Sequence, residues 1–414
     1  MKNKVSYPWV VVGLLWFVAL LNYMDRQMLS TMRISMMKDI VELESAANFG
    51  RLMAIFLWIY GLMSPASGII ADRISRKWLI VCSLGVWSAV TLLIGFATNY
   101  NQLYILRGIM GVSEALYLPS ALSLIADYHQ QKTRSLAVGI HMTGLYLGQA
   151  IGGFGATLAL AYSWNQTFHW FGIIGVSYSI VLAFLLKDKA RTADNVKSGM
   201  SSMNKTSVLK VLAMLFSNTF FWVILLYFCI PSLPGWATKN WLPTLFSQSL
   251  SIDMSVAGPM ATITIALSSF IGVIFGGILS DRWIISNLKG RIFTGAIGLS
   301  LIIPSLAIIG FGQSLVMVIS GAVLFGIGFG MFDANNMPIL CQFVPSQNRA
   351  TAYGIMNMAG VFAGAVITTF LGKSTDAGNL GRDFALMTVV VLIVLIIQLS
   401  FLKPKTDDMK EILK

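Results

Sequence analysis

Long apolar stretches separated by short polar segments dominate this chain, and twelve of them reach the length of a membrane span. About 18 to 20 apolar residues in a helix cross the hydrocarbon core of a bilayer. The predicted spans cover roughly 8–32, 51–71, 77–98, 101–126, 135–160, 167–187, 210–236, 256–280, 291–311, 314–337, 348–372 and 382–402. The pattern therefore predicts an all-α membrane protein with twelve transmembrane helices.

Composition supports this prediction. Hydrophobic residues make up 56% of the chain and charged residues 11%, whereas an ordinary soluble domain carries about 25% charged residues. This small number of charges could not cover a surface exposed to water. We therefore predict that most of the protein surface contacts lipid. The three cysteines lie far apart without metal-ligand spacing, and we expect no metal site.

The net charge of +12 could indicate a nucleic-acid partner, but its distribution indicates membrane topology. With the N-terminus placed in the cytoplasm, 21 of the 29 basic residues fall in inner segments and six in outer loops. This asymmetry is the positive-inside rule, and it predicts that both termini are cytoplasmic in a multi-pass inner (plasma) membrane protein. The basic residues are thus assigned to topology, with the lipid bilayer and not nucleic acid as the partner.

A polar stretch at roughly 187–209 separates six predicted spans from the other six. We interpret 1–187 as an N-terminal six-helix half, 188–209 as a cytoplasmic linker, 210–403 as a C-terminal six-helix half and 404–414 as a cytoplasmic tail.

Two motifs recur at nearly the same offset, which indicates that the halves are duplicated. The pattern G-x-x-x-D-R begins at Gly68 and again at Gly277, 209 positions later. The pattern R-x-x-x-x-G begins at Arg134 and again at Arg349, 215 positions later. Parallel repeats of this kind are typical of one class of secondary transporters, whose substrate site lies between the halves.

The segment from Gly68 to Lys77, G-I-I-A-D-R-I-S-R-K, resembles the signature loop between spans two and three of the major facilitator superfamily. The resemblance implies that family's fold of two parallel six-helix halves. Charges at a helix end can pair and hold the inner face shut. The predicted inner-gate residues are Gly68, Asp72, Arg73, Arg76, Lys77, Asp281 and Arg282.

Glycines at every fourth position of span five, Gly144, Gly148 and Gly152, share one helix face. Small residues on one face allow two helices to cross closely. We therefore assign these glycines to packing.

Charged residues at membrane depth are costly and are functional candidates by default. Five qualify, namely Asp25, Arg26, Arg107, Glu114 and Asp333, and the first four sum to zero charge. Arg107 and Glu114 are seven residues apart, nearly two helical turns, which places them on one face about 10 Å apart. The alternative is a set of mutually paired structural charges, although burying two ion pairs where leucine would serve is expensive.

The motifs N-Y-x-D-R in span one and R-x-x-x-x-x-x-E in span four resemble those of the anion–cation symporter family, which includes galactonate, glucarate and hexuronate proton symporters. The resemblance implies that Arg107 engages the substrate carboxylate, that Asp25 and Glu114 carry protons, and that Arg26 takes part in charge pairing. It also implies that Tyr23, and Tyr60 in a W-x-Y of span two, belong to the substrate site. The sequence departs from the family at Ser64, where Gln is frequent, and at Val361, near the position of a second asparagine beside Asn357.

Coupling could arise from competition for Arg107. An arginine stays charged in a protein, so a desolvated Arg107 needs a counter-anion, either the substrate or Glu114. We therefore predict that substrate binding at Arg107 would leave Glu114 unpaired and favour its protonation.

The second half contributes weaker candidates. Asp333 is interpreted as a proton-coupling residue or, equally, a gate residue, and Asn335 and Asn336 beside it could bind sugar hydroxyls. Tyr227 and Trp241, near prolines predicted to break span seven, could stack on a sugar ring or belong to an interfacial aromatic belt. In span five, Gln149 is predicted to line the substrate site and His141 to be a packing residue; Asn357 in span eleven completes the predicted substrate-binding set.

These observations predict a secondary active transporter that takes up a small organic anion, a sugar acid such as a hexonate, hexuronate or sialic acid, with protons and acts as a monomer. No nucleophile–base constellation supports an enzyme, and no cofactor is expected beyond the coupling proton. An anion exchanger or exporter of the same fold is the alternative. A non-transporting receptor is a further alternative, disfavoured by the short linker and tail.

Overall fold

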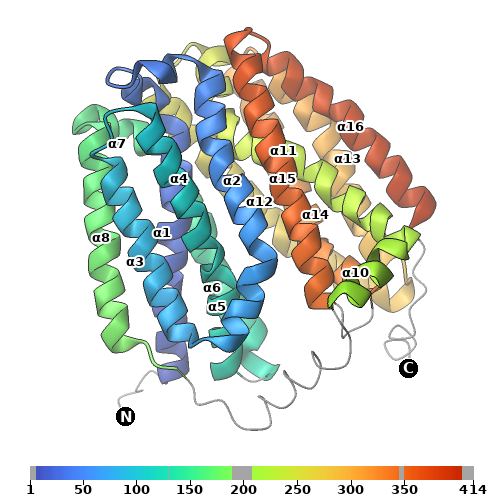
Figure 1. Ribbon diagram of the computed structural model, residues 1–414. Coiled ribbons are helices and arrows are strands. Elements are labelled where there is room, and N and C mark those ends of the chain that lie inside the picture. The colour runs from blue at the N-terminus through green and yellow to red at the C-terminus, as the bar shows by residue number, and fades with distance from the viewer. Residues whose placement is uncertain (1–5, 130, 189–207, 345–348, 403–414) are drawn as a thin grey trace, which may run out of the picture. The chain divides into compact units, whose positions relative to one another are not determined.

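The computed structural model describes residues 6–129, 131–188, 208–344 and 349–402, in which the regular elements are helices. They are α1 (Tyr7–Met36), α2 (Ala46–Arg73), α3 (Arg76–Ile94), α4 (Tyr100–Ala115), α5 (Tyr117–Tyr128), α6 (Gln131–Gly152), α7 (Gly155–Ala161), α8 (Trp164–Leu185), α10 (Val208–Ser217), α11 (Thr219–Leu250), α12 (Met254–Ser286), α13 (Gly290–Phe311), α14 (Leu315–Cys341), α15 (Arg349–Asp376) and α16 (Leu380–Phe401), with a short 3₁₀ helix at Val41–Glu44 (Figure 1).

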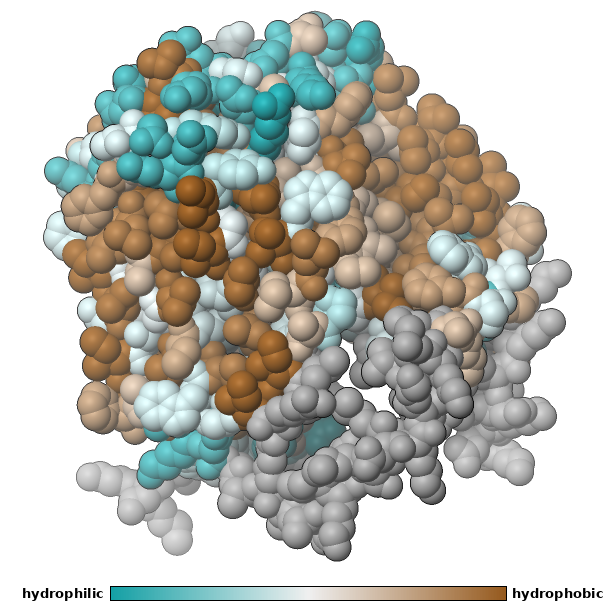
Figure 2. Space-filling model, viewed as in Figure 1, coloured by the Kyte–Doolittle hydropathy of each residue, from teal (hydrophilic) through white to brown (hydrophobic). Residues whose placement is uncertain are grey.

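In the described residues, eleven helical spans are long and apolar enough to cross a membrane, or twelve if the bent pair α6–α7 counts as one. This agrees with the twelve spans predicted. Figure 2 shows hydrophobic residues over much of the face that it draws, with hydrophilic residues gathered above them at the upper left. The apolar stretches of the sequence thus form helices whose outer surface is hydrophobic, as expected of a protein surrounded by lipid.

Two predicted spans contain breaks that the apolar pattern did not reveal. Predicted span four divides at Leu116 into α4 and α5, and Pro119 lies in the first turn of α5, where its missing N–H costs little. Predicted span five divides after Gly152, and the two pieces meet at 45°.

The prediction that prolines break span seven is wrong, because α11 continues through Pro231, Pro234 and Pro243. A proline inside a helix removes the donor for the carbonyl four residues earlier. For Pro243 that carbonyl belongs to Lys239, and the Gln27 Nε2 donates to it at 2.8 Å. A donor from another helix therefore replaces the missing one here, as is common in membrane helices.

The chain forms two compact units. Unit 1 comprises Met1–Ala190, Lys239–Ile263 and Thr368–Asp376, and unit 2 comprises Arg191–Thr238, Thr264–Ile367 and Ala377–Lys414. Three helices, α11, α12 and α15, therefore contribute residues to both units. The predicted division into halves at 188–209 stays a prediction, since most of that linker lies outside the described residues.

Inside unit 1, α1 packs closely along α6. A Cβ atom on Gly144 would lie 2.6 Å from the Trp16 carbonyl oxygen, and one on Gly148 would lie 2.2 Å from that of Leu20. Side chains larger than hydrogen do not fit at either position. The prediction that this glycine row permits a tight helix crossing is confirmed, and the crossing fixes the α1 residues of the candidate site.

The two arginines of the repeated R-x-x-x-x-G motif make equivalent contacts. The Arg134 side chain donates to the carbonyls of Ala126 and His129, eight and five residues earlier. Arg349 donates to the carbonyls of Cys341 and Val344, again eight and five residues earlier. Each guanidinium thus satisfies carbonyls at the end of the preceding helix. The matching contacts agree with an internal duplication.

Candidate substrate site

The charged residues of α1 and α4 meet inside unit 1. The Arg26 Nε donates to the Glu114 Oε2 at 2.5 Å, and the Asn22 Nδ2 donates to the same oxygen at 2.9 Å. Asn22 and Arg26 are four residues apart and so lie on one face of α1. The Glu114 side chain is buried, so its charge depends on these two donors from α1.

Aromatic rings surround the Arg26 guanidinium. Its Cζ lies 5.2 Å from the ring centroid of Tyr23, 4.8 Å from that of Phe56 and 4.8 Å from that of Tyr60. Such contacts stabilise a cation through the negative face of the ring, and more strongly where water is excluded. The predicted residues Tyr23 and Tyr60 thus lie beside the charge cluster, and Phe56 joins them from α2.

Arg107 has no comparable anionic partner. Within the part of the chain that the structure describes, no carboxylate lies within ion-pair distance of it, and its Nε is buried without a hydrogen bond. Its polar contact is with the Met110 sulfur at 3.1 Å, a weak acceptor, and its Cζ lies 4.7 Å from the Phe56 centroid. A buried arginine in this state retains hydrogen-bonding capacity for a carboxylate.

The predicted competition between substrate and Glu114 for Arg107 needs correction, because the cation bonded to Glu114 is Arg26. Spacing along α4 places Arg107 and Glu114 on one face, but α1 brings a closer guanidinium to the acid. Glu114 and Arg107 therefore interact across a longer distance, through their charges.

Asp25, the other predicted proton carrier, faces α3. Its Oδ2 lies 3.3 Å from the Thr91 hydroxyl, which also lies 3.0 Å from the Trp87 carbonyl and has one hydrogen to donate to the two, and its Oδ1 is buried without a hydrogen bond. Only 5% of the Asp25 surface is exposed. An incompletely hydrogen-bonded buried carboxylate is costly as an anion, and this cost favours a carboxyl that can accept a proton.

The candidates of α14 lie in unit 2. The Asn335 Nδ2 donates to the Met331 carbonyl at 2.8 Å, and the Asn336 Nδ2 donates to the Asp333 Oδ1 at 3.2 Å. The oxygens of both amides are buried without a donor, whereas Asp333 is exposed. The Tyr227 hydroxyl is buried without a hydrogen bond, and its ring meets the edge of Phe332 at 5.2 Å. Several polar atoms of this unit thus remain available to a polar ligand.

The remaining substrate-binding candidates occupy diverse positions. Gln149 of α6 is buried, and Asn357 of α15 is partly exposed. Trp241 is fully buried in unit 1, where its Nε1 donates to the Thr368 carbonyl at 3.0 Å. His141 is fully buried with its Nε2 at 2.9 Å from the Tyr117 hydroxyl, as its packing interpretation predicts.

The structure describes only some residues of the predicted inner gate. Arg76 forms an ion pair with Asp127, and the Lys77 backbone N–H donates to Asp188 at 2.9 Å. Asp281 and Arg282 are exposed on α12. The side chains of Asp72 and Arg73 and the surroundings of Gly68 lie outside the described part of the structure, so the gating role of these three residues stays a prediction.

Sequence reasoning missed three contributors to the site, Asn22, Phe56 and Thr91. For Asn22 and Phe56 a signal existed, because each precedes a predicted site residue by four positions, Arg26 and Tyr60 respectively, and so shares its helix face. Thr91 carries no such signal, since it reaches Asp25 only through the packing of α3.

Comparison with known proteins places these features in a family. The profile of the Major Facilitator Superfamily matches residues 15–368. "Probable galactarate/D-glucarate transporter GudP" of Bacillus subtilis (strain 168) is 27% identical over 91% of this chain and 87% of its own length. "Probable L-galactonate transporter" of Escherichia coli (strain K12) is 24% identical over 89% and 83%. "4-hydroxybenzoate transporter PcaK" of Pseudomonas putida is 26% identical over 94% and 90%.

Solved structures agree on the fold. A bacterial homolog of the human lysosomal transporter Spinster superposes with a TM-score of 0.80 at 18% identity, covering 98% of this chain and 100% of that one. The resemblance predicted from the first, second and fourth spans is thus confirmed by the family match and by relatives named as probable galactarate/D-glucarate and L-galactonate transporters. The chain is a multi-pass membrane transporter and belongs to the Major Facilitator Superfamily.

Proposed function

We propose that this transporter takes up a sugar acid together with protons, with Arg107 as the primary carboxylate ligand. The observation that carries the proposal is the state of Arg107, a buried guanidinium without an ion-pair partner among the described residues. A substrate carboxylate would supply the missing acceptors in a bidentate geometry suited to a guanidinium. The names of the relatives, galactarate, glucarate and galactonate transporters, support a polyhydroxylated acid.

Proton coupling is assigned to the two buried acids of α1 and α4, Asp25 and Glu114. Anion entry against an inside-negative potential is opposed by about 2.3 kcal/mol per charge per 100 mV. One proton per monoanion makes the step electroneutral, and a second makes the potential a driving force. Protonation of Glu114 would also release Arg26 from its ion pair. When the acid is neutral, the charge of Arg26 is no longer compensated and adds to the positive charge near the substrate.

Direction and topology are part of the proposal. The distribution of Lys and Arg supports cytoplasmic termini in an inner (plasma) membrane protein. In that orientation, an inward proton gradient drives uptake.

Uptake by proteoliposomes tests the proposal. Radiolabelled D-galactonate and D-glucarate are the probes, and liposomes carry an inward proton gradient, no gradient, or a gradient collapsed by a protonophore. Accumulation above the external concentration in the first condition alone supports symport. Gradient-independent swapping of external for internal label would identify an exchanger instead. Outward accumulation driven by the opposite gradient would identify an exporter.

A further inference from the structure

Arg107 is enclosed by one neighbour on its own helix and one on α2. The residue exposes only 4% of its surface. The Phe56 ring covers the guanidinium, with the Arg107 Cζ 4.7 Å from the ring centroid, and the Met110 sulfur lies 3.1 Å from the Arg107 Nη1. A carboxylate that accepts from two N–H groups of this guanidinium therefore requires one of the two neighbours to move.

Phe56 forms the more rigid side of this enclosure. A Cβ atom on Gly111, the residue after Met110, would lie 2.7 Å from the Phe56 carbonyl oxygen, so α2 and α4 touch through their backbones here. The Phe56 ring also contacts the Arg26 guanidinium, whose Cζ lies 4.8 Å from the ring centroid. Moving the ring would break contacts with two cations, and the close packing of the two helices leaves the backbone little room to follow.

Met110 forms the side of the enclosure that can move. Its side chain is unbranched, with three rotatable bonds and a polarizable thioether, and such a side chain adapts readily to a changed environment. Arg107 and Met110 are three residues apart in α4 and therefore share a helix face. This spacing brings the sulfur to the guanidinium without any contribution from another helix.

The thioether is a poor partner for a buried cation. The sulfur of methionine is a weak acceptor without charge. Hydrogen bonds between a guanidinium and a carboxylate are charge-assisted and roughly twice as strong as neutral ones. The sulfur satisfies part of the donor capacity of Arg107, whose Nε remains buried without a hydrogen bond. Exchange of the sulfur for a carboxylate is therefore favourable, and the sulfur can return when the carboxylate leaves.

We propose that Met110 is a resident ligand of Arg107, whose sulfur occupies the Nη1 until a substrate carboxylate displaces it. The sulfur gives the buried guanidinium a partner in the absence of substrate, but it binds too weakly to exclude a carboxylate. Met110 thereby tunes the affinity of the site, because each substrate must break this contact when it binds. The proposal rests on the proposed role of Arg107 as the carboxylate ligand.

Graded replacement of the acceptor tests the role of Met110. Met110→Leu nearly conserves the volume but has no acceptor, and Met110→Gln places an amide oxygen, a stronger acceptor, on an unbranched side chain. We expect D-galactonate to bind Met110→Leu about threefold more tightly than the parent, and Met110→Gln about tenfold more weakly. Calorimetry on purified protein measures both dissociation constants. A purely structural defect would weaken binding in both variants, so the tighter binding by Met110→Leu distinguishes the two explanations.

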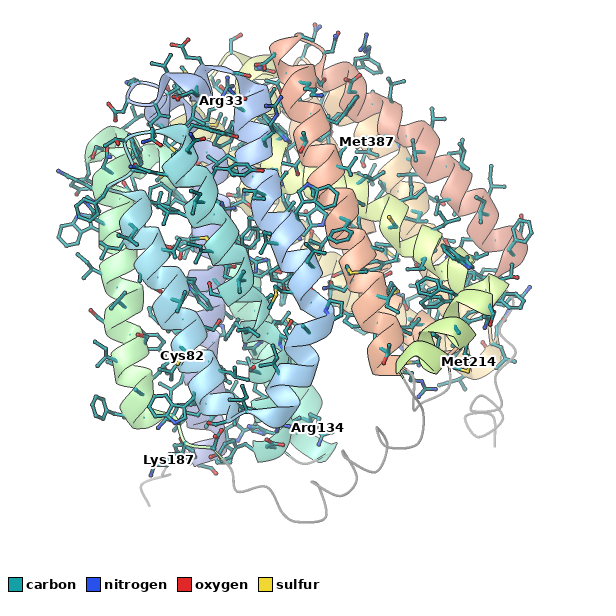
Figure 3. All side chains as sticks on the ribbon, viewed as in Figure 1. Arg33, Cys82, Arg134, Lys187, Met214 and Met387 are labelled. Carbon is teal, nitrogen blue, oxygen red and sulfur yellow. The ribbon has the colours of Figure 1, made fainter. Side chains whose placement is uncertain are left out.

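Met387→Leu and Met387→Gln are the matched controls. Met387, labelled in Figure 3, is a buried methionine of α16 in unit 2. We expect both replacements to leave the affinity for D-galactonate within about twofold of the parent, because effects of distant sites are independent. Thermal unfolding of all four variants identifies any that has lost its fold.

A methyl signal gives a readout that does not depend on affinity. The 22 methionines are labelled with carbon-13 at their methyl groups, and the Met110 signal is the one missing from the NMR spectrum of Met110→Leu. We expect saturating D-galactonate to shift the Met110 signal, and D-galactose, which has hydroxyls but no carboxylate, to leave it in place. Without any ligand, Arg107→Ala should also shift this signal, whereas Arg382→Ala, at an exposed arginine, should not.

The outcomes separate the role of Met110 from the proposed function. If Arg107→Ala binds D-galactonate as tightly as the parent, Arg107 is not the carboxylate ligand, and both proposals fail. If Arg107→Ala binds weakly while Met110→Leu and Met110→Gln bind as the parent does, the role of Arg107 stands and that of Met110 is overturned. A Met110 signal that stays in place at saturating D-galactonate overturns the role of Met110 as well.

Discussion

The Arg26 Nε and the Glu114 Oε2 lie 2.5 Å apart and form an ion pair between α1 and α4. This ion pair makes the surroundings of Arg26 different from those of Arg107, the other arginine of the candidate site. Arg26 is held by a carboxylate and by three aromatic rings. Arg107, on the same helix as Glu114, retains its donors. One cation is therefore neutralised within the protein, whereas the other has no ion-pair partner among the described residues.

Replacing Arg107 should weaken substrate binding strongly, with little loss of folding. Arg107→Ala removes the predicted carboxylate ligand, and hydrogen bonds to charged groups contribute about 1.5–3 kcal/mol, so affinity should fall by roughly ten- to a hundredfold. Binding of D-galactonate or D-glucarate is measured by calorimetry on purified protein. Arg382→Ala, an exposed arginine beside Asp383, serves as the control. Unchanged affinity in Arg107→Ala would exclude Arg107 as the anion ligand.

Phe56 should couple the two arginines, because both guanidiniums contact its ring, at 4.8 and 4.7 Å. Phe56→Leu keeps much of the apolar volume but removes the π-face, which is worth roughly 0.5–2 kcal/mol per cation. We expect a lower melting temperature and weaker substrate binding. Phe56→Tyr should retain both. If Phe56→Leu and Phe56→Tyr behave alike, the ring face has no role in holding the cations.

The spans and most members of the site could be predicted, because they depend on local properties of the chain. Apolar length predicts a span, and a charge at membrane depth stands out from its neighbours. The glycine row of α6 was predictable for the same reason. Each of these signals lies within one helix.

What could not be predicted is which groups pair between helices. The bond from Arg26 to Glu114 depends on how α1 and α4 are rotated about their axes, which the crossing of α1 and α6 helps to set. The continuity of α11 was missed for a similar reason. Proline at 243 removes a local donor, and the replacement comes from Gln27, far away in sequence.

The repeated arginines should have equal structural importance in the two halves. Arg134 and Arg349 each donate to two carbonyls at the end of the preceding helix. Alanine at either position removes these hydrogen bonds, and we expect a loss of about 0.5–1.5 kcal/mol of stability. Thermal unfolding in detergent measures both variants against Arg51→Ala, which has an exposed side chain. A loss in one variant alone would show that the shared contacts are not equally important.

The last prediction concerns which buried acid couples transport to protons. Glu114→Gln mimics the protonated acid, because the amide is neutral and its oxygen can still accept from Asn22 and Arg26. Arg107 is untouched, so we expect binding and exchange of substrate to persist. Uphill accumulation should be lost, because position 114 no longer gains and loses a proton. Both activities are measured in proteoliposomes, by counterflow without a proton gradient and by uptake with one.

Asp25→Asn provides the comparison, because Asp25 is also buried but is hydrogen-bonded to Thr91 and has no ion pair with Arg26 among the described residues. If Glu114 alone couples, Asp25→Asn should accumulate substrate to the same extent as the parent. A smaller accumulation ratio would indicate that Asp25 carries a second proton. Accumulation by Glu114→Gln together with its loss in Asp25→Asn would transfer the coupling role to Asp25. In that case the Arg26–Glu114 pair would be structural, and the incompletely hydrogen-bonded carboxylate of α1 would be the proton carrier, since it is the acid without a bonded cation to hold it charged.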